Sequence, residues 1–226
     1  GEAFSNSYIF KVAKKEKHLK TRINEIVTIT KGKKVVHMGF CDHIPLIEKK
    51  INSNHWLHNE LLKNCEKCIG IDIDQVAVDH IKTNYSIPDI YCHDILSRDL
   101  LPAIVNDRYD YFVLGEILEH IDNPIAFLAK IKENYGSYFD NIIISVPNAL
   151  SYHNFKNTFK GIEQLNTDHR YWFTPYTLAK IITRAGYRLD EFALCQYYEG
   201  NGPLKRIMYR RFPLLRHCLM LTASTK

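Results

Sequence analysis

The order of elements along this chain constrains its fold more than any other feature of the sequence. Segments with helical spacing of apolar residues lie over 55–62, 74–85, 124–131 and 174–185. Apolar runs of strand length alternate with them, and two more strands are expected near 188–195 and 218–222. Such alternation predicts an α/β domain in which parallel strands carry helices on both faces. The five apolar runs are Val35–Met38, Cys68–Ile71, Ile90–Cys92, Tyr109–Leu114 and Ile142–Val146.

The 226 residues suit one domain with small additions. We expect a helical extension over 1–33, followed by the main domain over 34–226. The long aromatic segment at 149–173 lies between a strand and a helix, which predicts a lid over the site. A second addition, rich in Arg and Tyr, is expected at 196–217, between the last two strands.

Positive charge gathers at both ends of the chain. Residues 1–34 hold nine Lys or Arg against three acids, and residues 203–226 hold six Lys or Arg and no acid. Basic ends of this kind favour phosphates, nucleic acid or an anionic membrane surface. Solvated faces that only aid solubility are the alternative interpretation.

The composition disfavours several classes of protein. No apolar run approaches the roughly 18 residues of a membrane span, and the first residues lack the basic start and apolar core of a signal peptide. Six cysteines, several of them inside apolar runs, fit reduced and buried thiols, so we expect a cytoplasmic protein. The pair Cys65 and Cys68 leads into a strand, so neither zinc nor redox chemistry is expected there.

Polar or conformationally special residues follow each of the five central strands. In parallel α/β sheets the ligand binds beyond the carboxyl ends of the strands, so these residues should share one rim. The first loop has one glycine, followed by Phe40 and Asp42, whereas a pyrophosphate fingerprint needs several glycines. An acidic loop poor in glycine suits a cationic ligand without phosphate. The residues at the strand ends are Gly39, Asp72, Asp94, Gly115–Glu116 and Asn148.

Five segments of the chain resemble the motifs of class I methyltransferases, which use S-adenosylmethionine. The resemblance covers about residues 34–195 and is strongest to enzymes of ubiquinone biosynthesis and of bacterial surface-polysaccharide and glycan pathways. It implies a Rossmann-like methyltransferase fold, a doubly wound seven-stranded sheet that is mostly parallel and has an antiparallel last strand. It also implies S-adenosylmethionine as the cofactor. The five segments are Val35–Gly39, Cys68–Asp72, His93–Ile95, Tyr109–His120 and Ile144–Asn148.

The same resemblance assigns residues to the cofactor. Asp72 stands where the family's acid holds the ribose, and Asp94 stands beside the adenine. The first motif departs from the family, because His37 replaces the usual acid and Gly39 is the one glycine that remains. Asp42 is expected to supply the missing carboxylate for the methionine amine. The expected cofactor-binding residues are Gly39, Phe40, Asp42, Asp72, Ile73, Asp94, Ile95, Gly115 and Glu116.

A separate group of acids and histidines is the candidate for catalysis. Glu116, Glu119 and His120 stand at i, i+3 and i+4, so on a helix they would share one face. Together with His169 they form a candidate site for a divalent cation. The pattern resembles that of small-RNA 3′-end methyltransferases and ubiquinone-pathway enzymes. Alternatively, Glu119 and His120 only fasten the segment beside the cofactor. As the base we predict His120 first and His169 second.

We therefore expect an O-methyltransferase that acts on the hydroxyl of a sugar or of a glycan-linked small molecule, in polysaccharide biosynthesis. Such a hydroxyl is a weak nucleophile, so a base or a metal should assist the transfer. Two alternatives stay open: a metal-dependent RNA 2′-O-methyltransferase, and a non-catalytic binding protein with a decayed cofactor pocket. The expected partner is a small-molecule or glycan acceptor rather than a nucleic acid.

Overall fold

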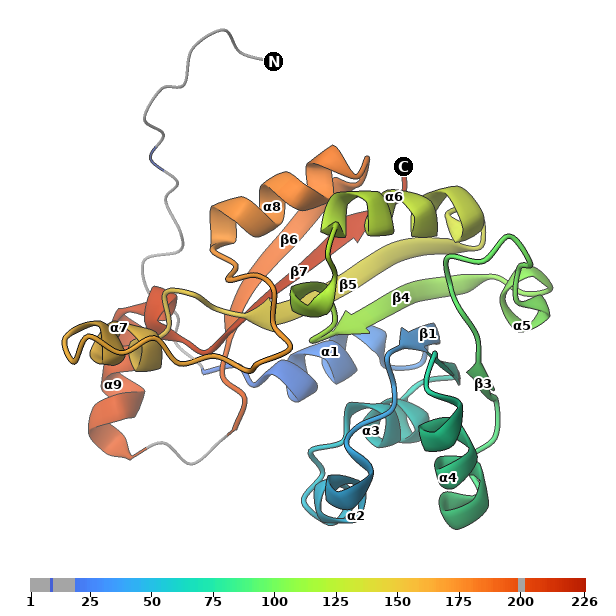
Figure 1. The fold of residues 1–226 in the computed structure, drawn as a ribbon, viewed down its shortest axis with the longest axis horizontal. Coiled ribbons are helices and arrows are strands. Elements are labelled where there is room, and N and C mark those ends of the chain that lie inside the picture. Colours follow the sequence, from blue (N-terminus) through green and yellow to red (C-terminus); the bar gives the residue numbers. More distant parts are fainter. Residues whose placement is uncertain (1–8, 10–18, 199–201) are drawn as a thin grey trace, which may run out of the picture.

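The computed structural model describes residue 9, residues 19–198 and residues 202–226. A single sheet runs through the described part of the chain, with helices on both of its faces (Figure 1). The strands are β1 (Lys34–Met38), β2 (Lys67–Asp72), β3 (Ile90–Cys92), β4 (Tyr109–Gly115), β5 (Phe139–Pro147), β6 (Arg188–Cys195) and β7 (Cys218–Ser224). The helices are α1 (Arg22–Thr30), α2 (Ile44–Asn52), α3 (Leu57–Asn64), α4 (Gln75–Tyr85), α5 (Pro102–Val105), α6 (Pro124–Tyr135), α7 (Tyr152–Thr158), α8 (Pro175–Arg184) and α9 (Pro203–Arg211), with 3₁₀ turns η1 (Leu118–His120) and η2 (Pro213–Leu215).

The seven strands lie in the order β3-β2-β1-β4-β5-β7-β6. Five of them pair in parallel, and β7 runs antiparallel between β5 and β6. This arrangement confirms the predicted doubly wound, mostly parallel sheet with its antiparallel last strand. The strand order reverses direction between β1 and β4, and in such sheets a ligand binds beyond the carboxyl ends of the strands at that point.

Both faces of the central strands are buried, which is why their sequences are continuously apolar rather than alternating. Val35 and Val113 pack on one side with α1 and α3. Val36 and Phe112 pack on the other side with α6 and α8. Figure 1 shows α6 and α8 above the sheet and α1, α3 and α4 below it. A third cluster joins α2 and α4 to β3. The core therefore holds the strand ends in fixed relative positions.

Side-chain caps fix where the helices begin after these strand ends. The Asp74 carboxylate accepts from the Ala77 amide at 3.0 Å and begins α4. The Asn123 side chain accepts from the Ala126 amide at 3.0 Å and begins α6. Thr174 caps α8, with Pro175 in its first turn as the sequence predicts. Each such cap contributes about 1 kcal/mol and limits the length of the loop before it.

Three further points differ from the expectations or extend them. The expected N-terminal helix is observed over Arg22–Thr30, and residues 10–18 lie outside the described residues. The stretch 116–120 does not form the helix considered for it, since only the short η1 is present. The additions at 149–173 and 196–217 contain α7 and α9. None of the described helices is both long and apolar enough to cross a membrane.

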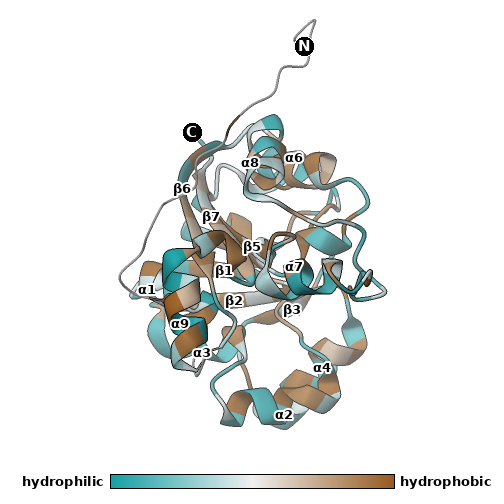
Figure 2. Cartoon of the chain, turned by 90° about the vertical axis from the view of Figure 1, so that its left-hand side faces the viewer, coloured by the Kyte–Doolittle hydropathy of each residue, from teal (hydrophilic) through white to brown (hydrophobic). Residues whose placement is uncertain are grey.

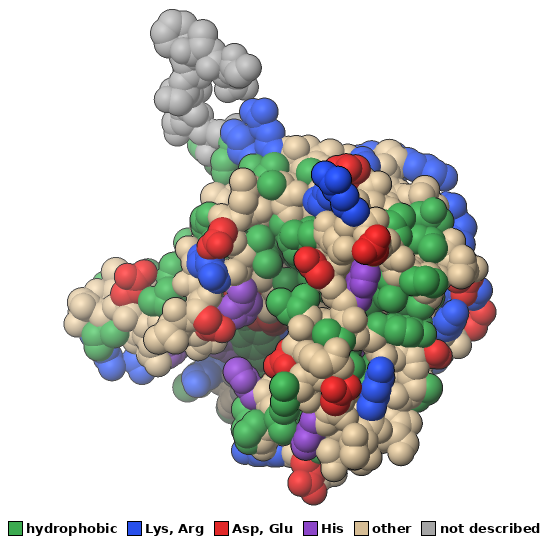
Figure 3. All heavy atoms as spheres, turned by 45° about the vertical axis from the view of Figure 1, so that its right-hand side comes forward, with side chains coloured by type: hydrophobic (Ala, Val, Ile, Leu, Met, Phe, Trp, Pro, Cys, Tyr) green, Lys and Arg blue, Asp and Glu red, His purple; other side chains and the backbone are tan. Residues whose placement is uncertain are grey.

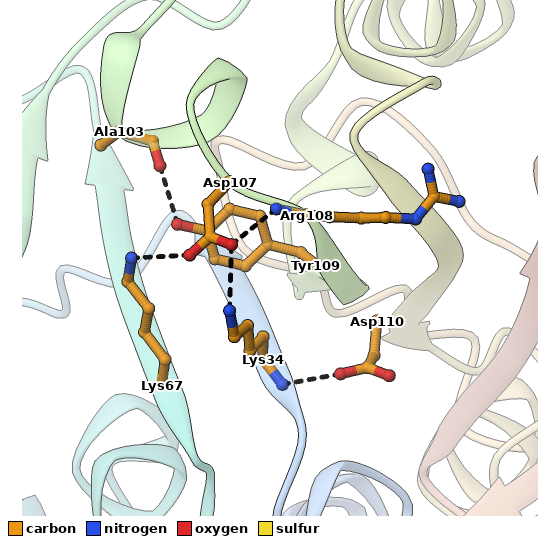
Figure 4. A network of polar contacts seen from close by, with 7 residues as sticks. All are labelled: Lys34, Lys67, Ala103, Asp107, Arg108, Tyr109 and Asp110. Atoms are coloured by element: carbon orange, nitrogen blue, oxygen red, sulfur yellow. Dashed lines mark hydrogen bonds and ion pairs between the residues drawn. The ribbon is translucent and has the colours of Figure 1, made fainter.

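At the opposite, amino-terminal end of the strands, a network of charged residues joins β1, β2 and the start of β4 (Figure 4). The Asp107 carboxylate accepts from Lys34 Nζ at 3.0 Å and from Lys67 Nζ at 2.9 Å. These two lysines and the Arg108 amide hold the pKa of Asp107 well below its usual range. The network fastens three adjacent strands at the end of the sheet that faces away from the rim.

Candidate active site

Backbone hydrogen bonds continue beyond the strand ends and bring the predicted residues to one rim. The Gly39 amide donates to the Ile71 carbonyl at 2.8 Å, and the His93 amide donates to the Asp72 carbonyl at 2.8 Å. The Glu116 amide donates to the Ser145 carbonyl at 2.9 Å. The loops after β1, β2, β3 and β4 therefore leave the sheet side by side.

Gly39 lets the first loop approach the fourth. Its φ is +67°, a left-handed conformation that side chains rarely adopt. A Cβ at this position would lie 2.1 Å from Ile117 Cδ1. Glycine is thus required here twice, by the backbone and by the packing, although no other glycine of the family motif remains.

Asp72 at the end of β2 organises the neighbouring loop. Its carboxylate accepts from the Cys41 amide at 3.1 Å and from the Asp74 amide at 3.1 Å. Each carboxylate oxygen keeps a lone pair for a ligand hydroxyl. Ile73, the next residue, is 70% exposed. An acid followed by an uncovered aliphatic side chain offers hydrogen bonds to a ribose and an apolar surface to a flat base.

The other residues expected around the cofactor lie in different environments. The Phe40 ring is buried beside Trp56, so only its backbone faces the loop. Asp42 forms an ion pair with Lys50 and accepts from the His43 amide, so its carboxylate is already partnered. Asp94 is exposed and accepts from the Leu96 amide at 2.9 Å.

Two further expected residues, Ile95 and Gly115, are placed by packing. Ile95 is buried in the main core, at 1% exposure, so its side chain is a wall of the site rather than an open contact. Gly115 ends β4, and a Cβ on it would lie 3.0 Å from Arg22 Nη1. The absence of a side chain at Gly115 therefore lets a cation from α1 reach the rim.

Glu116 departs from the expected geometry. Its φ is +61°, so the chain turns at this residue instead of continuing as a helix. Its carboxylate accepts a hydrogen bond from the Tyr197 hydroxyl at 2.6 Å and lies 3.7 Å from Cys218 Sγ. The common helical face expected for Glu116, Glu119 and His120 is therefore not formed.

Arg22 is a rim residue that the sequence analysis did not identify. The Arg22 amide donates to the Gln196 carbonyl at 2.8 Å, which fastens the start of α1 to the end of β6. Its Nη1 donates to Ser145 Oγ at 3.4 Å. Burial works to lower the pKa of Arg22, but Glu116 and other nearby groups leave it above its ordinary value. No local motif marks Arg22 or Tyr197, because each reaches the rim through a contact distant in sequence.

Glu119, His120 and His169 form a compact group that could hold a metal ion. One ligand atom from each lies within 4.8 Å of the others, and Glu116 is outside this group. Glu119 is fully buried, and within the described residues neither of its carboxylate oxygens has a hydrogen-bond partner. Burial, and then the charge of Glu116, raises the pKa of Glu119 to about 9. Burying an unpartnered carboxylate is costly, so a cation or a proton donor beside Glu119 would stabilise it.

The segment 149–173 supplies His169 and is fastened to η1 by several contacts. The Arg170 amide donates to the Glu119 carbonyl at 2.7 Å, and its guanidinium pairs with Asp122. Asp168 lies 3.2 Å from His120 Nδ1. The rings of His120 and His169 meet edge to face, 4.7 Å between centroids. Burial and the nearby His120 lower the pKa of His169, which favours the neutral imidazole that binds metals.

One face of the molecule is hollowed between a lobe and the main body, and histidine and acidic side chains gather around the hollow (Figure 3). His37, which replaces the family's acid in the first motif, does not lie at the surface. It is 3% exposed, and its Nδ1 lies 3.2 Å from His58 Nδ1. His37 is thus a core residue, and the charge missing from the first motif is not restored by its imidazole.

Known proteins resemble this chain in sequence pattern and in fold. The family described as a methyltransferase domain matches residues 53–191. The small RNA methyltransferase HEN1 is structurally similar, with a TM-score of 0.61 and 17% identity over 96% of this chain and 27% of that one. The chain thus spans about a quarter of the length of HEN1. No curated protein matches the chain significantly.

Two other solved structures cover comparable lengths. The methyltransferase domain of bacterial-CtHen1-CN has a TM-score of 0.54 and 17% identity over 90% of this chain and 97% of that one. Magnesium protoporphyrin IX methyltransferase from Synechocystis PCC 6803, solved with bound SAH, has a TM-score of 0.55 and 12% identity over 89% and 81%. At these identities the likeness concerns the fold, and the family match carries the activity. The chain belongs to the methyltransferase domain family, the enzymes that transfer a methyl group from S-adenosylmethionine.

Proposed function

We propose that this methyltransferase acts on a hydroxyl of a sugar or a glycan-linked small molecule, and that Glu119, His120 and His169 hold a divalent cation that assists it. One observation carries the proposal: the buried Glu119 carboxylate, without a hydrogen-bond partner among the described residues, lies beside two imidazoles. Oxygen and imidazole ligands in this combination suit Mg²⁺, Mn²⁺ or related ions. A carboxylate, two imidazoles and open positions leave room for an acceptor oxygen.

The residues of the rim fit S-adenosylmethionine. Asp72 would accept from the ribose hydroxyls, and Ile73 would cover one face of the adenine. Arg22 and Glu116 carry opposite charges close to Gly115. Such a pair suits the carboxylate and the ammonium group of the methionine end, so we assign the amine to Glu116 rather than to Asp42, which is paired with Lys50.

The reaction needs the acceptor oxygen to be deprotonated as it approaches the methyl group in line. A bound divalent cation lowers the pKa of a coordinated hydroxyl. Glu119 and the two imidazoles would hold the cation in place and so orient the acceptor oxygen bound to it. Asp168, which lies 3.2 Å from His120 Nδ1, orients the His120 ring. The segment 149–173 keeps His169 in place and limits the access of water.

A ribose 2′-hydroxyl of RNA is the second candidate acceptor, because it is also a sugar hydroxyl. The group of Glu119, His120 and His169 favours it as much as it favours a glycan. Two of the similar structures are HEN1 proteins, one of them a small RNA methyltransferase. At 17% identity their similarity to this chain is evidence for a shared fold alone. The two acceptors are separated by incubating the enzyme and labelled S-adenosylmethionine with RNA oligonucleotides or with sugars and glycans.

The cation is tested by calorimetry with MnCl₂ on the purified protein. We expect one equivalent of Mn²⁺ to bind and Glu119→Gln to weaken binding by at least about tenfold, since a charged ligand is lost. Glu133→Gln, which changes an exposed side chain of α6, is the matched control. Binding of S-adenosylhomocysteine by each variant reports that the fold is intact. Equal Mn²⁺ affinity in Glu119→Gln and in the parent protein would refute the cation site.

A further inference from the structure

The connection between β6 and β7 carries a helix with uncovered aliphatic side chains. Leu204 and Ile207 of α9 are 82% and 64% exposed, and Phe212 directly after it is 51% exposed. Apolar surface of this kind gains free energy when another apolar phase covers it. α9 also lies beyond residue 191, where the family match ends.

The orientation of α9 is fixed by its opposite face. Tyr209 is 2% exposed, and its ring centroid lies 5.6 Å from that of His217. The Tyr209 carbonyl accepts from Arg216 Nε at 3.2 Å. Two residues before Tyr209, Ile207 projects roughly 160° away around the helix, since each residue turns it by about 100°. The aliphatic residues are therefore held outward, at the edge of the molecule in Figure 1.

The exposed surface of α9 is also strongly basic. Residues 203–226 contain no acid, so nothing in this part of the sequence neutralises the positive charge. Figure 2 shows hydrophilic and hydrophobic residues interleaved along α9. A partner must therefore present negative charge and an apolar layer together. The exposed basic residues of the helix are Lys205, Arg206, Arg210 and Arg211.

We propose that α9 is a docking surface for an anionic lipid bilayer. Leu204 and Ile207 would enter the boundary between headgroups and acyl chains, while Arg206, Arg210 and Arg211 contact lipid phosphates. A second copy of the chain is a poor partner for α9, because two helices of like charge repel each other. A nucleic acid would satisfy the arginines but would leave the aliphatic side chains in water.

Docking through α9 would bring the rim of the sheet to the bilayer. The connection that carries α9 starts from Cys195 and returns at Cys218. In the sheet, Cys218 lies in register between Cys195 of β6 and Pro147 at the carboxyl end of β5. If the acceptor is a sugar, as proposed above, one attached to a membrane lipid would lie within reach. This use of the surface rests on the proposed function, whereas binding to lipid does not.

Sedimentation with vesicles tests the docking without any methyl transfer. We expect the full chain to sediment with equimolar phosphatidylglycerol and phosphatidylcholine and to stay in solution with phosphatidylcholine alone. Arg206→Gln/Arg210→Gln should weaken binding by about thirtyfold, because each basic residue at the surface contributes roughly five- to sixfold. Leu204→Ser/Ile207→Ser should weaken it by on the order of tenfold or more.

Matched controls remove the same chemistry elsewhere. Leu46→Ser/Val76→Ser takes two exposed aliphatic side chains from α2 and α4, and Lys180→Gln/Arg184→Gln takes two charges from α8. Both controls should bind vesicles like the parent protein, and all variants should bind S-adenosylhomocysteine. Unchanged vesicle binding by Leu204→Ser/Ile207→Ser would overturn the proposal. The proposal would also be overturned if the protein bound polyuridylate through the arginines but did not bind vesicles. Binding to neither polyuridylate nor vesicles would overturn it as well.

Discussion

In the proposed function, single side chains at the rim recognise different ends of one ligand. Asp72 lies at the end of β2 with lone pairs free beyond the Cys41 and Asp74 amides. Arg22 reaches the end of β4 from α1, beside Gly115. The first is suited to neutral hydroxyls and the second to an anion. Substitutions at the two positions should therefore be distinguishable by the ligand that is offered.

We expect Asp72→Ala to weaken binding of S-adenosylhomocysteine by ~1.5–3 kcal/mol, the usual loss for hydrogen bonds to a charged group. The same change should weaken 5′-methylthioadenosine, which has the ribose but no amino acid. Arg22→Met should weaken S-adenosylhomocysteine alone. Calorimetry with both ligands measures this, with Asp72→Asn as the variant that keeps one of the two loop contacts. An Arg22→Met variant that loses both ligands equally would contradict the assignment to the carboxylate.

At the scale of elements, the site depends on how closely the loops after β1 and β4 approach each other. Gly39 and Ile117 are in contact across them, and both loops turn through left-handed residues, Gly39 and Glu116. Tyr197, from the start of the connection between β6 and β7, holds the Glu116 carboxylate. The geometry of the rim is thus shared among elements that are far apart in the sequence.

Gly39→Ala should destabilise the protein by at least about 2 kcal/mol, through an unfavourable backbone conformation and a clash with Ile117. Chemical denaturation measures the change. Adding Ile117→Ala removes the clash. We expect the double variant to regain part of the stability that the clash costs, but not the part lost to the unfavourable backbone conformation. If Gly39→Ala unfolds at the same denaturant concentration as the parent protein, the loops after β1 and β4 do not approach each other as closely as described.

The elements were predictable where local pattern decides them. Buried strands such as β5 are continuously apolar, and α8 carries its own start signals in Thr174 and Pro175, so sequence alone located both. Glu116 shows the limit, because its turn depends on a hydrogen bond to Tyr197, 81 residues later. Arg22 was missed for the same reason. The strand ends predicted which residues lie side by side at one edge of the sheet, but side-chain directions there are set by tertiary contacts.

Across the whole molecule, two polar features of the interior respond to pH in the same direction. The pair of His37 and His58 lies in the core under the first loop. Burial lowers the pKa of His58 to about 3. Burial also lowers the pKa of His37 well below its ordinary value, and the nearby charge of His58 lowers it further. At the far end of the sheet, the two lysines lower the pKa of Asp107.

Stability should fall as the pH drops below about 6.5, because His37 and His58 bind protons in the unfolded chain but stay neutral in the folded state. For two such groups the loss reaches roughly 4 kcal/mol near pH 5. Denaturation at several pH values measures the slope. His37→Val removes one of the two groups, so we expect about half the slope. An identical slope in this variant would show that other groups cause the acid sensitivity.

Asp107→Asn should cost about 1–2 kcal/mol at neutral pH, since the partly exposed carboxylate holds two lysines but is screened by solvent. The depressed pKa means that this stabilisation is present above the ordinary value for Asp and fades as the pH falls below it. Raised salt should shrink the difference between the variant and the parent protein. Asp140→Asn, which loses an exposed pair with Arg108, is the control with little expected effect.

The placement of the late loops has a consequence for how such enzymes diversify. The segments 149–173 and 196–217 both start and finish on the joined tips of β5, β6 and β7, or on α8 beside them. Neither interrupts β1 to β4. A descendant of this chain could therefore acquire a new acceptor through changes in these segments, as long as Tyr197 and the Gln196 carbonyl, which hold Glu116 and Arg22, stay in place.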